Sequence, residues 1–168
     1  EIVAKAGFEA NIIENHDQPR GASLFIPEED YGFYSLSALA TIIFCERGLP
    51  FLYQGQEIGM SNRQWKYDEF NDLETINQYQ IALKAGMSKE QALEIARHHS
   101  RDNARTPMQW SSEENAGFSK GKPWMPVNEN YKVVNVAEEE KEYGSILNFY
   151  KRLIAFYKSE EYNEILTY

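Results

Sequence analysis

The sequence has 168 residues, enough for one domain with a core, and its content of 42% hydrophobic and 14% aromatic residues is typical of a globular protein rather than a disordered one. Its 17 basic and 26 acidic residues give a net charge of −9, which disfavours binding to nucleic acid or to an anionic membrane surface. The longest apolar stretch, residues 36–45, is too short to span a bilayer. Cys45 is the only cysteine, so an internal disulfide is excluded, and we expect its side chain to be buried.

The first half of the chain predicts a buried strand, a loop, a helix and a second buried strand. Residues 8–13 form a short apolar run that ends in polar residues, which is typical of a strand. Residues 21–30 are predicted to be a loop. Residues 31–47 carry apolar side chains at spacings of three and four, which predicts a helix that ends at Gly48. Because a helix separates the first strand from the second, predicted over 49–53, we expect a parallel crossover.

A long polar segment, which we call the excursion (residues 55–135), follows the second strand. Two helical patterns lie within it, over 72–84 and 88–98, and Ser88 with Gln91 predicts a capping box at the start of the second. The rest of the excursion is predicted to be mostly loop. Loops of this length inside a compact domain are usually functional.

A final helix is predicted over residues 145–158, where apolar side chains occupy one broad face. The chain opens at Glu1 and closes on Tyr168, and we expect both ends to be cuts in a longer protein.

The tripeptide Asn15-His16-Asp17, directly after the first predicted strand, allows two interpretations. An aspartate there can accept hydrogen bonds from sugar hydroxyls or stabilise a developing positive charge, while a neutral histidine can bind a neighbouring hydroxyl. Equally, Asn and Asp cap the backbone in turns, and Pro19 ends the strand. The tripeptide alone favours the turn.

A second polar cluster, Arg101 to Arg105, places two guanidinium groups four residues apart around Asp102. Such a pair suits the binding of an acidic or hydroxyl-rich group. A surface ion-pair cluster at the end of a helix is the alternative, and the residues alone favour it slightly.

Neither histidines nor acidic residues predict a metal site. His98 and His99 are adjacent, so their side chains diverge on a helix. Asp68, Glu69 and Asp72 lack the spacing of a calcium loop, and we expect them to form a solvated acidic face. Three tryptophans of the excursion either stack on sugar rings or anchor irregular structure: Trp65, Trp110 and Trp124.

Read together, the motifs resemble glycoside hydrolase family 13, the α-amylase superfamily. FEANIIENHDQPR (8–20) resembles its seventh-strand signature and GLPFLYQGQEIGM (48–60) its eighth-strand segment. SRDNARTPMQW (100–110) and NAGFSKGKPWMPVNENYKVVNV (115–136) resemble an insertion of the oligo-1,6-glucosidase and α-glucosidase subgroup. SILNFYKRLIAFYK (145–158) resembles the helix that closes the barrel.

This resemblance implies an α/β fold, namely a helix-rich fragment of a (β/α)8 TIM barrel. The chain would supply the last two β/α units and a long, partly helical insertion. Residues 1–160 would be the C-terminal part of the catalytic barrel, and residues 161–168 would begin the β-rich domain that follows it.

The resemblance also implies a retaining α-glucosidase that hydrolyses terminal α-glucosidic bonds of short oligosaccharides, without cofactor or metal. The nucleophile and the acid/base would lie on strands outside this chain. Asp17 matches the third carboxylate, which stabilises the transition state, and Arg101 matches an arginine that closes the sugar pocket. The other implied site residues are His16, Arg105 and Gln18, with Asn103 and Arg20 as further candidates for lining or bracing the site.

Other functions remain open. Trehalose-6-phosphate hydrolases and sucrose isomerases resemble the same stretch. So do the inactive glucosidase-like partner domains of amino-acid transporters, although these often lose catalytic positions that are present here. We expect the isolated chain to be inactive, and either to self-associate or to adopt a non-native packing. From the lone cysteine and from the subgroup we expect a cytoplasmic location.

Overall fold

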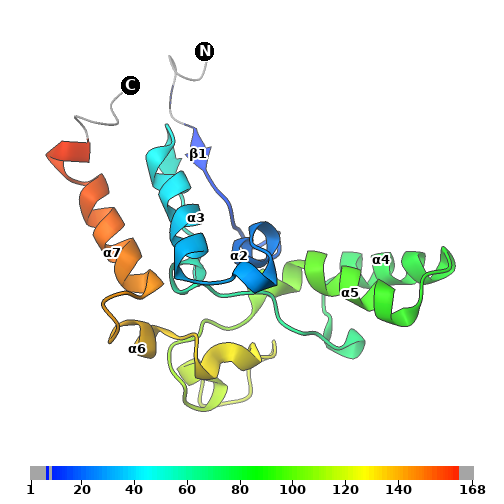
Figure 1. Ribbon diagram of the computed structural model, residues 1–168. Helices are drawn as coiled ribbons and strands as arrows, with labels where there is room; N and C mark the ends of the chain where they lie inside the picture. The colour runs from blue at the N-terminus through cyan, green and yellow to red at the C-terminus, as the bar shows by residue number, and fades with distance from the viewer. Residues whose placement is uncertain (1–6, 8, 163–168) are drawn as a thin grey trace.

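The computed structural model describes residue 7 and residues 9–162 (Figure 1). Its strands are β1 (Ala10–Asn11) and β2 (Leu49–Pro50). Its α-helices are α2 (Gly21–Phe25), α3 (Phe33–Cys45), α4 (Leu73–Lys84), α5 (Lys89–His99), α6 (Val136–Glu139) and α7 (Ile146–Tyr157). Short 3₁₀ turns cover Glu28–Asp30, Gln56–Ile58, Tyr67–Glu69, Arg101–Arg105, Glu114–Gly117 and Glu129–Lys132.

The two strands pair in parallel, which confirms the crossover predicted from the sequence. Ala10 lies opposite Leu49, and Asn11 lies opposite Pro50. Both strands are shorter than the predicted segments 8–13 and 49–53, although Phe8 lies outside the described residues. Among the described residues each strand has only the other as a partner, so the ladder is confined to the few residues where they meet.

The end of α3 is tied to β1 by one side chain. The Asn11 amide donates hydrogen bonds to the carbonyls of Ile43 (3.0 Å) and Glu46 (2.9 Å), which satisfies carbonyls that a helix end leaves without partners. The chain then turns at Gly48, where φ is +142°. A Cβ at Gly48 would lie 2.4 Å from the Asn11 side-chain oxygen, so only glycine fits this turn.

The segment 21–30 was predicted to be a loop, and this prediction is wrong: it contains α2 and the 3₁₀ turn Glu28–Asp30. The helix forms where Gly21 and Ala22 are buried. A Cβ at Gly21 would lie 3.2 Å from a carboxylate oxygen of Glu14, so the small residue allows close packing against that side chain. This tertiary contact, rather than local propensity, places the helix here.

Helices α3 and α7, which correspond to the predicted helices 31–47 and 145–158, pack against each other and form the first core. Ser145 caps α7 by accepting a hydrogen bond from the Asn148 amide at 3.2 Å. Phe44 meets Tyr150 edge to face with ring centroids 6.4 Å apart. The buried members of this core are Ala40, Ile43, Phe44, Ile146, Tyr150 and Leu153.

Helices α4 and α5 form an antiparallel hairpin that projects away from α3 and α7 (Figure 1). The predicted capping box is confirmed, because the Gln91 amide donates to the Ser88 hydroxyl (3.2 Å) and the Ser88 amide donates to the Gln91 side chain (3.0 Å). The hairpin has its own core, made of Trp65, Phe70, Tyr79, Ala92, Ala96 and Met125. The excursion is therefore a packed unit rather than an open loop.

Two further expectations, one for Cys45 and one for the domain boundary, can be compared with the structure. Cys45, expected to be buried, is only half-buried because it lies at the exposed C-terminal end of α3. The domain boundary expected at residue 161 falls where only residues 161 and 162 are described. Within the described part of the chain, no helix is both long and apolar enough to cross a membrane.

Candidate functional site

The loop that follows β1 is closed at its base by a buried ion pair. Arg20 Nη1 lies 2.7 Å from Glu14 Oε1, and both side chains are almost fully buried. The second Glu14 oxygen accepts a hydrogen bond from the Gly21 amide at 3.0 Å. Burial raises the pKa of the Glu14 carboxyl, and the adjacent Arg20 opposes that shift. The pair fixes the two ends of the loop that carries His16 and Asp17.

Arg20 also ties this loop to two distant segments. Its Nη1 donates to the Gln54 carbonyl at 2.7 Å, just after β2, and its Nε donates to the Asn103 carbonyl at 3.2 Å. Its backbone amide donates to the Asn62 side chain at 2.9 Å. The ends of both strands and the turn Arg101–Arg105 are thereby held at one point.

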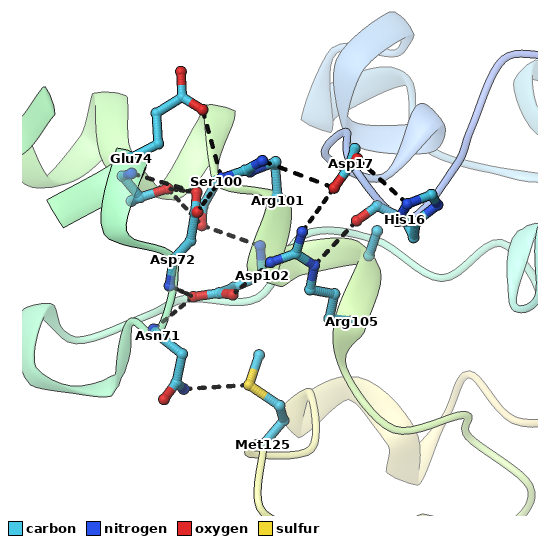
Figure 2. Close-up of polar contacts among 12 residues, drawn as sticks. His16, Asp17, Asn71, Asp72, Glu74, Ser100, Arg101, Asp102, Arg105 and Met125 are labelled. Atoms are coloured by element: carbon cyan, nitrogen blue, oxygen red, sulfur yellow. Dashed lines mark hydrogen bonds and ion pairs between the residues drawn. The ribbon is translucent and has the colours of Figure 1, made fainter. Parts of the chain in front are cut away.

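Asp17 lies on the exposed side of this loop, and its carboxylate meets both arginines of the cluster (Figure 2). Arg105 Nη2 donates to Asp17 Oδ1 at 2.7 Å, and Arg101 Nη1 lies 3.8 Å from the same oxygen. The Asp17 side chain is 51% exposed. The turn is instead made by Asn15, whose side chain accepts a hydrogen bond from the Asp17 amide at 2.8 Å. The turn interpretation therefore holds for Asn15, and it leaves the Asp17 carboxylate exposed beside the two arginines.

His16 lies beside Asp17, with its Nε2 3.3 Å from Asp17 Oδ2 (Figure 2). Its side chain is largely exposed. Its backbone carbonyl accepts a hydrogen bond from Arg105 Nε at 3.1 Å. Arg105 thus binds the backbone of one residue and the carboxylate of the next, which fixes this tip of the loop against the turn Arg101–Arg105.

Arg101 also forms an ion pair with Asp72, the residue that caps α4. Arg101 Nη2 donates to Asp72 Oδ1 at 2.5 Å, and Glu74 lies 3.5 Å from the same nitrogen. Burial acts to raise the pKa of the Asp72 carboxyl, but hydrogen bonds from Arg101 and Thr75 outweigh it and leave the pKa below its ordinary value. Asp72 was expected on a solvated acidic face. That expectation is wrong, because the side chain is buried against Arg101 and Thr75.

Arg105 also lies near a buried carboxylate, that of Asp102. Asp102 Oδ1 lies 3.8 Å from Arg105 Nη1, and Asp102 is 1% exposed. Its other oxygen accepts hydrogen bonds from the Asn71 and Asp72 amides, at 2.7 and 2.9 Å. The Arg101–Arg105 cluster forms ion pairs directly after α5, as its residues alone slightly favoured, and each arginine lies between an exposed carboxylate and a buried one.

The remaining predicted residues fall into two groups. Gln18 is exposed on the loop beside Asp17. Asn103 is fully buried, and its side chain accepts hydrogen bonds from the Arg63 amide (3.0 Å) and the Trp65 indole (2.7 Å). Arg20 and Asn103 therefore brace the site and do not line it. Of the tryptophans, Trp65 is buried as an anchor, whereas Trp110 and Trp124 are exposed.

Sequence reasoning missed Glu14 and Asp72 as parts of this arrangement. Glu14 directly follows an apolar run and precedes Arg20 by six residues. This pattern of opposite charges beside a buried strand was the signal that could have indicated a buried ion pair. Asp72 stands three residues before Thr75 at the start of a helical pattern, which indicates a cap but not a second contact.

Chemically, the arrangement offers an exposed carboxylate flanked by a histidine and two guanidinium groups. It can accept hydrogen bonds from vicinal hydroxyls through Asp17 and donate hydrogen bonds through Arg101 and Arg105. Within the described residues no group of three or more histidine, cysteine, aspartate or glutamate side chains is placed to hold a metal ion.

Comparison with known proteins matches this chain to one family over almost its whole length. It is 41% identical over 164 residues to the oligo-1,6-glucosidase of Bacillus cereus, which is 96% of this chain and 29% of that protein. Among solved structures, the trehalose-6-phosphate hydrolase of Bacillus licheniformis superposes with a TM-score of 0.85 at 42% identity, covering 90% of this chain and 28% of that one. The isomaltulose synthase of Klebsiella sp. LX3 superposes with a TM-score of 0.84 at 40% identity, covering 92% and 28%.

The chain spans less than a third of the length of the curated relatives that it matches. The family model "Alpha amylase, catalytic domain" matches residues 1–167. The chain therefore belongs to the α-amylase catalytic-domain family.

Proposed function

We propose that this chain is part of the catalytic barrel of a retaining α-glucosidase that hydrolyses terminal α-glucosidic bonds of short oligosaccharides. In this proposal Asp17 is the carboxylate that stabilises the transition state. Relatives named oligo-1,6-glucosidase, at about 40% identity, support this substrate class.

One observation carries the proposal. The Asp17 carboxylate, exposed on the loop that follows β1, is met by Arg105 from 88 positions away in the sequence, and Arg101 lies 3.8 Å from the same oxygen. A carboxylate held in place by protein cations, yet open to solvent, is suited to a ligand rather than to stability, because exposed ion pairs contribute little to folding.

Each residue then has a distinct role in holding the terminal sugar. Asp17 accepts hydrogen bonds from vicinal hydroxyls, and its charge stabilises the oxocarbenium-like ring that forms as the glycosidic bond breaks. His16 donates to or accepts from a neighbouring hydroxyl. Arg101 contacts the far side of the ring, which restricts the pocket to a chain end, and Arg105 and Gln18 line the site.

The chain's place in the barrel is part of the same proposal. The parallel pair β1 and β2, joined through α3, is consistent with the last two strands of a (β/α)8 barrel, with α7 as its closing helix. Residues 1–160 would then belong to the barrel, and residues 161–168 would begin the next domain. The excursion follows β2, at the end of the strands where barrel enzymes build their sites.

Replacing Asp17 with asparagine in the complete enzyme tests the role of this carboxylate. Asn keeps the shape and the capacity to accept a hydrogen bond but removes the charge, so we expect kcat on isomaltose to fall by about 10²–10³-fold with a small change in KM. Asp30→Asn is the matched control, because Asp30 is an exposed aspartate on the 3₁₀ turn Glu28–Asp30. Near-normal turnover in the Asp17 variant would remove the assignment.

A second candidate keeps the site and changes the substrate. The trehalose-6-phosphate hydrolase and isomaltulose synthase structures superpose on this chain with TM-scores of 0.85 and 0.84, which supports their substrates as alternatives. Incubating the complete enzyme with isomaltose, maltose, trehalose 6-phosphate and sucrose separates these functions by product. If the enzyme turns over none of the four substrates, this result would instead support the inactive partner domain of a transporter.

The isolated chain is expected to be inactive, because the nucleophile and the acid/base would lie in the part of the barrel that it does not span. Apolar side chains beside the strands, such as Ile12 and Phe51, are about half exposed in the described chain. Exposed strand edges with apolar neighbours favour self-association, which size-exclusion chromatography of the isolated chain would detect.

A further inference from the structure

We infer that two buried aspartates of the excursion, Asp72 and Asp102, are positioning residues that aim the guanidinium groups of Arg101 and Arg105 at Asp17. This inference rests on the proposed function, in which the two arginines contact the terminal sugar. It assigns part of the site's geometry to the α4–α5 hairpin rather than to the strands.

The first observation is how the Asp72 carboxylate divides its two oxygens. Oδ2 accepts hydrogen bonds from the Thr75 amide (3.3 Å) and the Thr75 hydroxyl (2.7 Å), which caps α4. Oδ1 accepts from Arg101 Nη2 at 2.5 Å. One oxygen is therefore fixed to the helix, and the other is fixed to the arginine.

The Asp102 carboxylate also uses its two oxygens differently, but it faces its arginine without a hydrogen bond. Its Oδ2 accepts from the backbone amides of Asn71 and Asp72, whereas Oδ1 is buried and has no hydrogen-bond partner among the described residues. The cation that faces this oxygen is Arg105, with Nη1 at 3.8 Å. A buried carboxylate oxygen without a hydrogen bond is costly, so its charge requires the nearby guanidinium.

The two aspartates belong to a single hydrogen-bonded unit (Figure 2). The Asp72 amide donates to Asp102, and the Ser100 hydroxyl lies 3.0 Å from the Thr75 hydroxyl, to which it can donate because the Thr75 proton is given to Asp72. The Ser100 hydroxyl accepts in turn from the Asp102 amide at 3.2 Å. The start of α4 and the start of the turn Arg101–Arg105 therefore move together, and so do the two carboxylates.

This unit pre-organises the arginines for a ligand. A free arginine side chain samples many rotamers, and ligand binding would otherwise have to remove that conformational entropy. Here each guanidinium lies between a buried aspartate and the exposed Asp17. The arginines are thus held in place before a sugar arrives.

A double-mutant cycle separates positioning from a purely structural role. We expect Asp102→Asn in the complete enzyme to lower kcat/KM on isomaltose about tenfold, because Asn still accepts from the two backbone amides but no longer attracts Arg105. In an Arg105→Ala background the same change should cost less than about twofold, because its target is already absent. Asp72→Asn and Arg101→Ala form the matching cycle, since asparagine caps a helix as well as aspartate does.

Asp68→Asn is the matched control, an exposed aspartate of the same excursion, and it should leave kcat/KM unchanged. A loss on Asp102→Asn that is equal in both backgrounds, or no loss in either, would overturn the inference. An inactive wild-type enzyme would instead refute the proposed function.

A second readout does not depend on activity. In a crystal structure of the complete Asp102→Asn protein, we expect Arg105 to leave the position in which its Nη2 contacts Asp17 at 2.7 Å. Arg105 remaining in that position would overturn the inference whether or not the protein is a glucosidase.

Discussion

The loop after β1 carries two ion-paired carboxylates, Glu14 and Asp17, whose ion pairs differ in exposure. Glu14 and Arg20 are buried to within 1% of complete burial, whereas Asp17, Arg101 and Arg105 keep 51, 34 and 31% of their side-chain surface exposed. The buried pair has all its partners within the protein. The exposed group also pairs within the protein but keeps part of its surface open to solvent. The difference separates a group that holds the loop in place from a group that remains available to a ligand.

The largest effect on stability is expected when the cation of the buried pair is removed. Arg20→Met leaves the Glu14 carboxylate buried without its partner, and we expect it to reduce the free energy of unfolding by about 3–5 kcal/mol, measured by urea denaturation. The double variant Glu14→Gln with Arg20→Met should recover part of this loss, because no charge then remains buried. A loss below about 1 kcal/mol for the single variant would show that the pair does not fix the loop.

Asp72 lies between the two extremes, because it is buried but pairs with a half-exposed arginine. Its pKa is depressed below the ordinary value of 3.8, so its stabilising contribution is fully present above that pH and is lost as the pH falls through the folded-state pKa. We expect the free energy of unfolding to decline as the pH drops below about 4, and Asp72→Asn to flatten that decline. Parallel pH dependences for the wild type and the variant would contradict this.

The smallest effect on stability is expected at the exposed group. Asp17→Asn removes contacts to Arg101 and Arg105 that water screens, so the free energy of unfolding should change by no more than about 1 kcal/mol. The same variant is expected to lose most of its turnover, and this contrast between stability and activity sharpens the comparison. Destabilisation as large as that of Arg20→Met would place Asp17 with the structural group.

Local signals in the sequence predicted the helices well. Ser88 and Gln91 define the start of α5 within four residues, and the apolar spacing of 145–158 matches α7 to one residue at each end. The same kind of signal failed for 21–30. There α2 depends on the buried contact between Gly21 and Glu14, which no local pattern reports.

The candidate site was predictable only in part, for the same physical reason. Asp17, Arg101 and Arg105 belong to recognisable motifs, and the structure brings them together. The residues that hold them do so over long separations: Arg20 reaches Asn103 across 83 positions, and the Asn71 amide reaches Asp102 across 31. Such contacts follow from the packed fold rather than from spacing along the chain.

One consequence follows from the position of Arg20 at the base of the excursion. Its amide and its guanidinium bind Asn62 and Asn103, which bracket the α4–α5 hairpin. The hairpin tip, where Gly86 has a φ of +92° and open space around it, lies at the other end of the hairpin from these hydrogen bonds. An affinity peptide or a fluorescent label inserted at that tip should therefore leave the distances around Asp17 unchanged. The tip is thus a suitable position for engineering the protein without altering its candidate site.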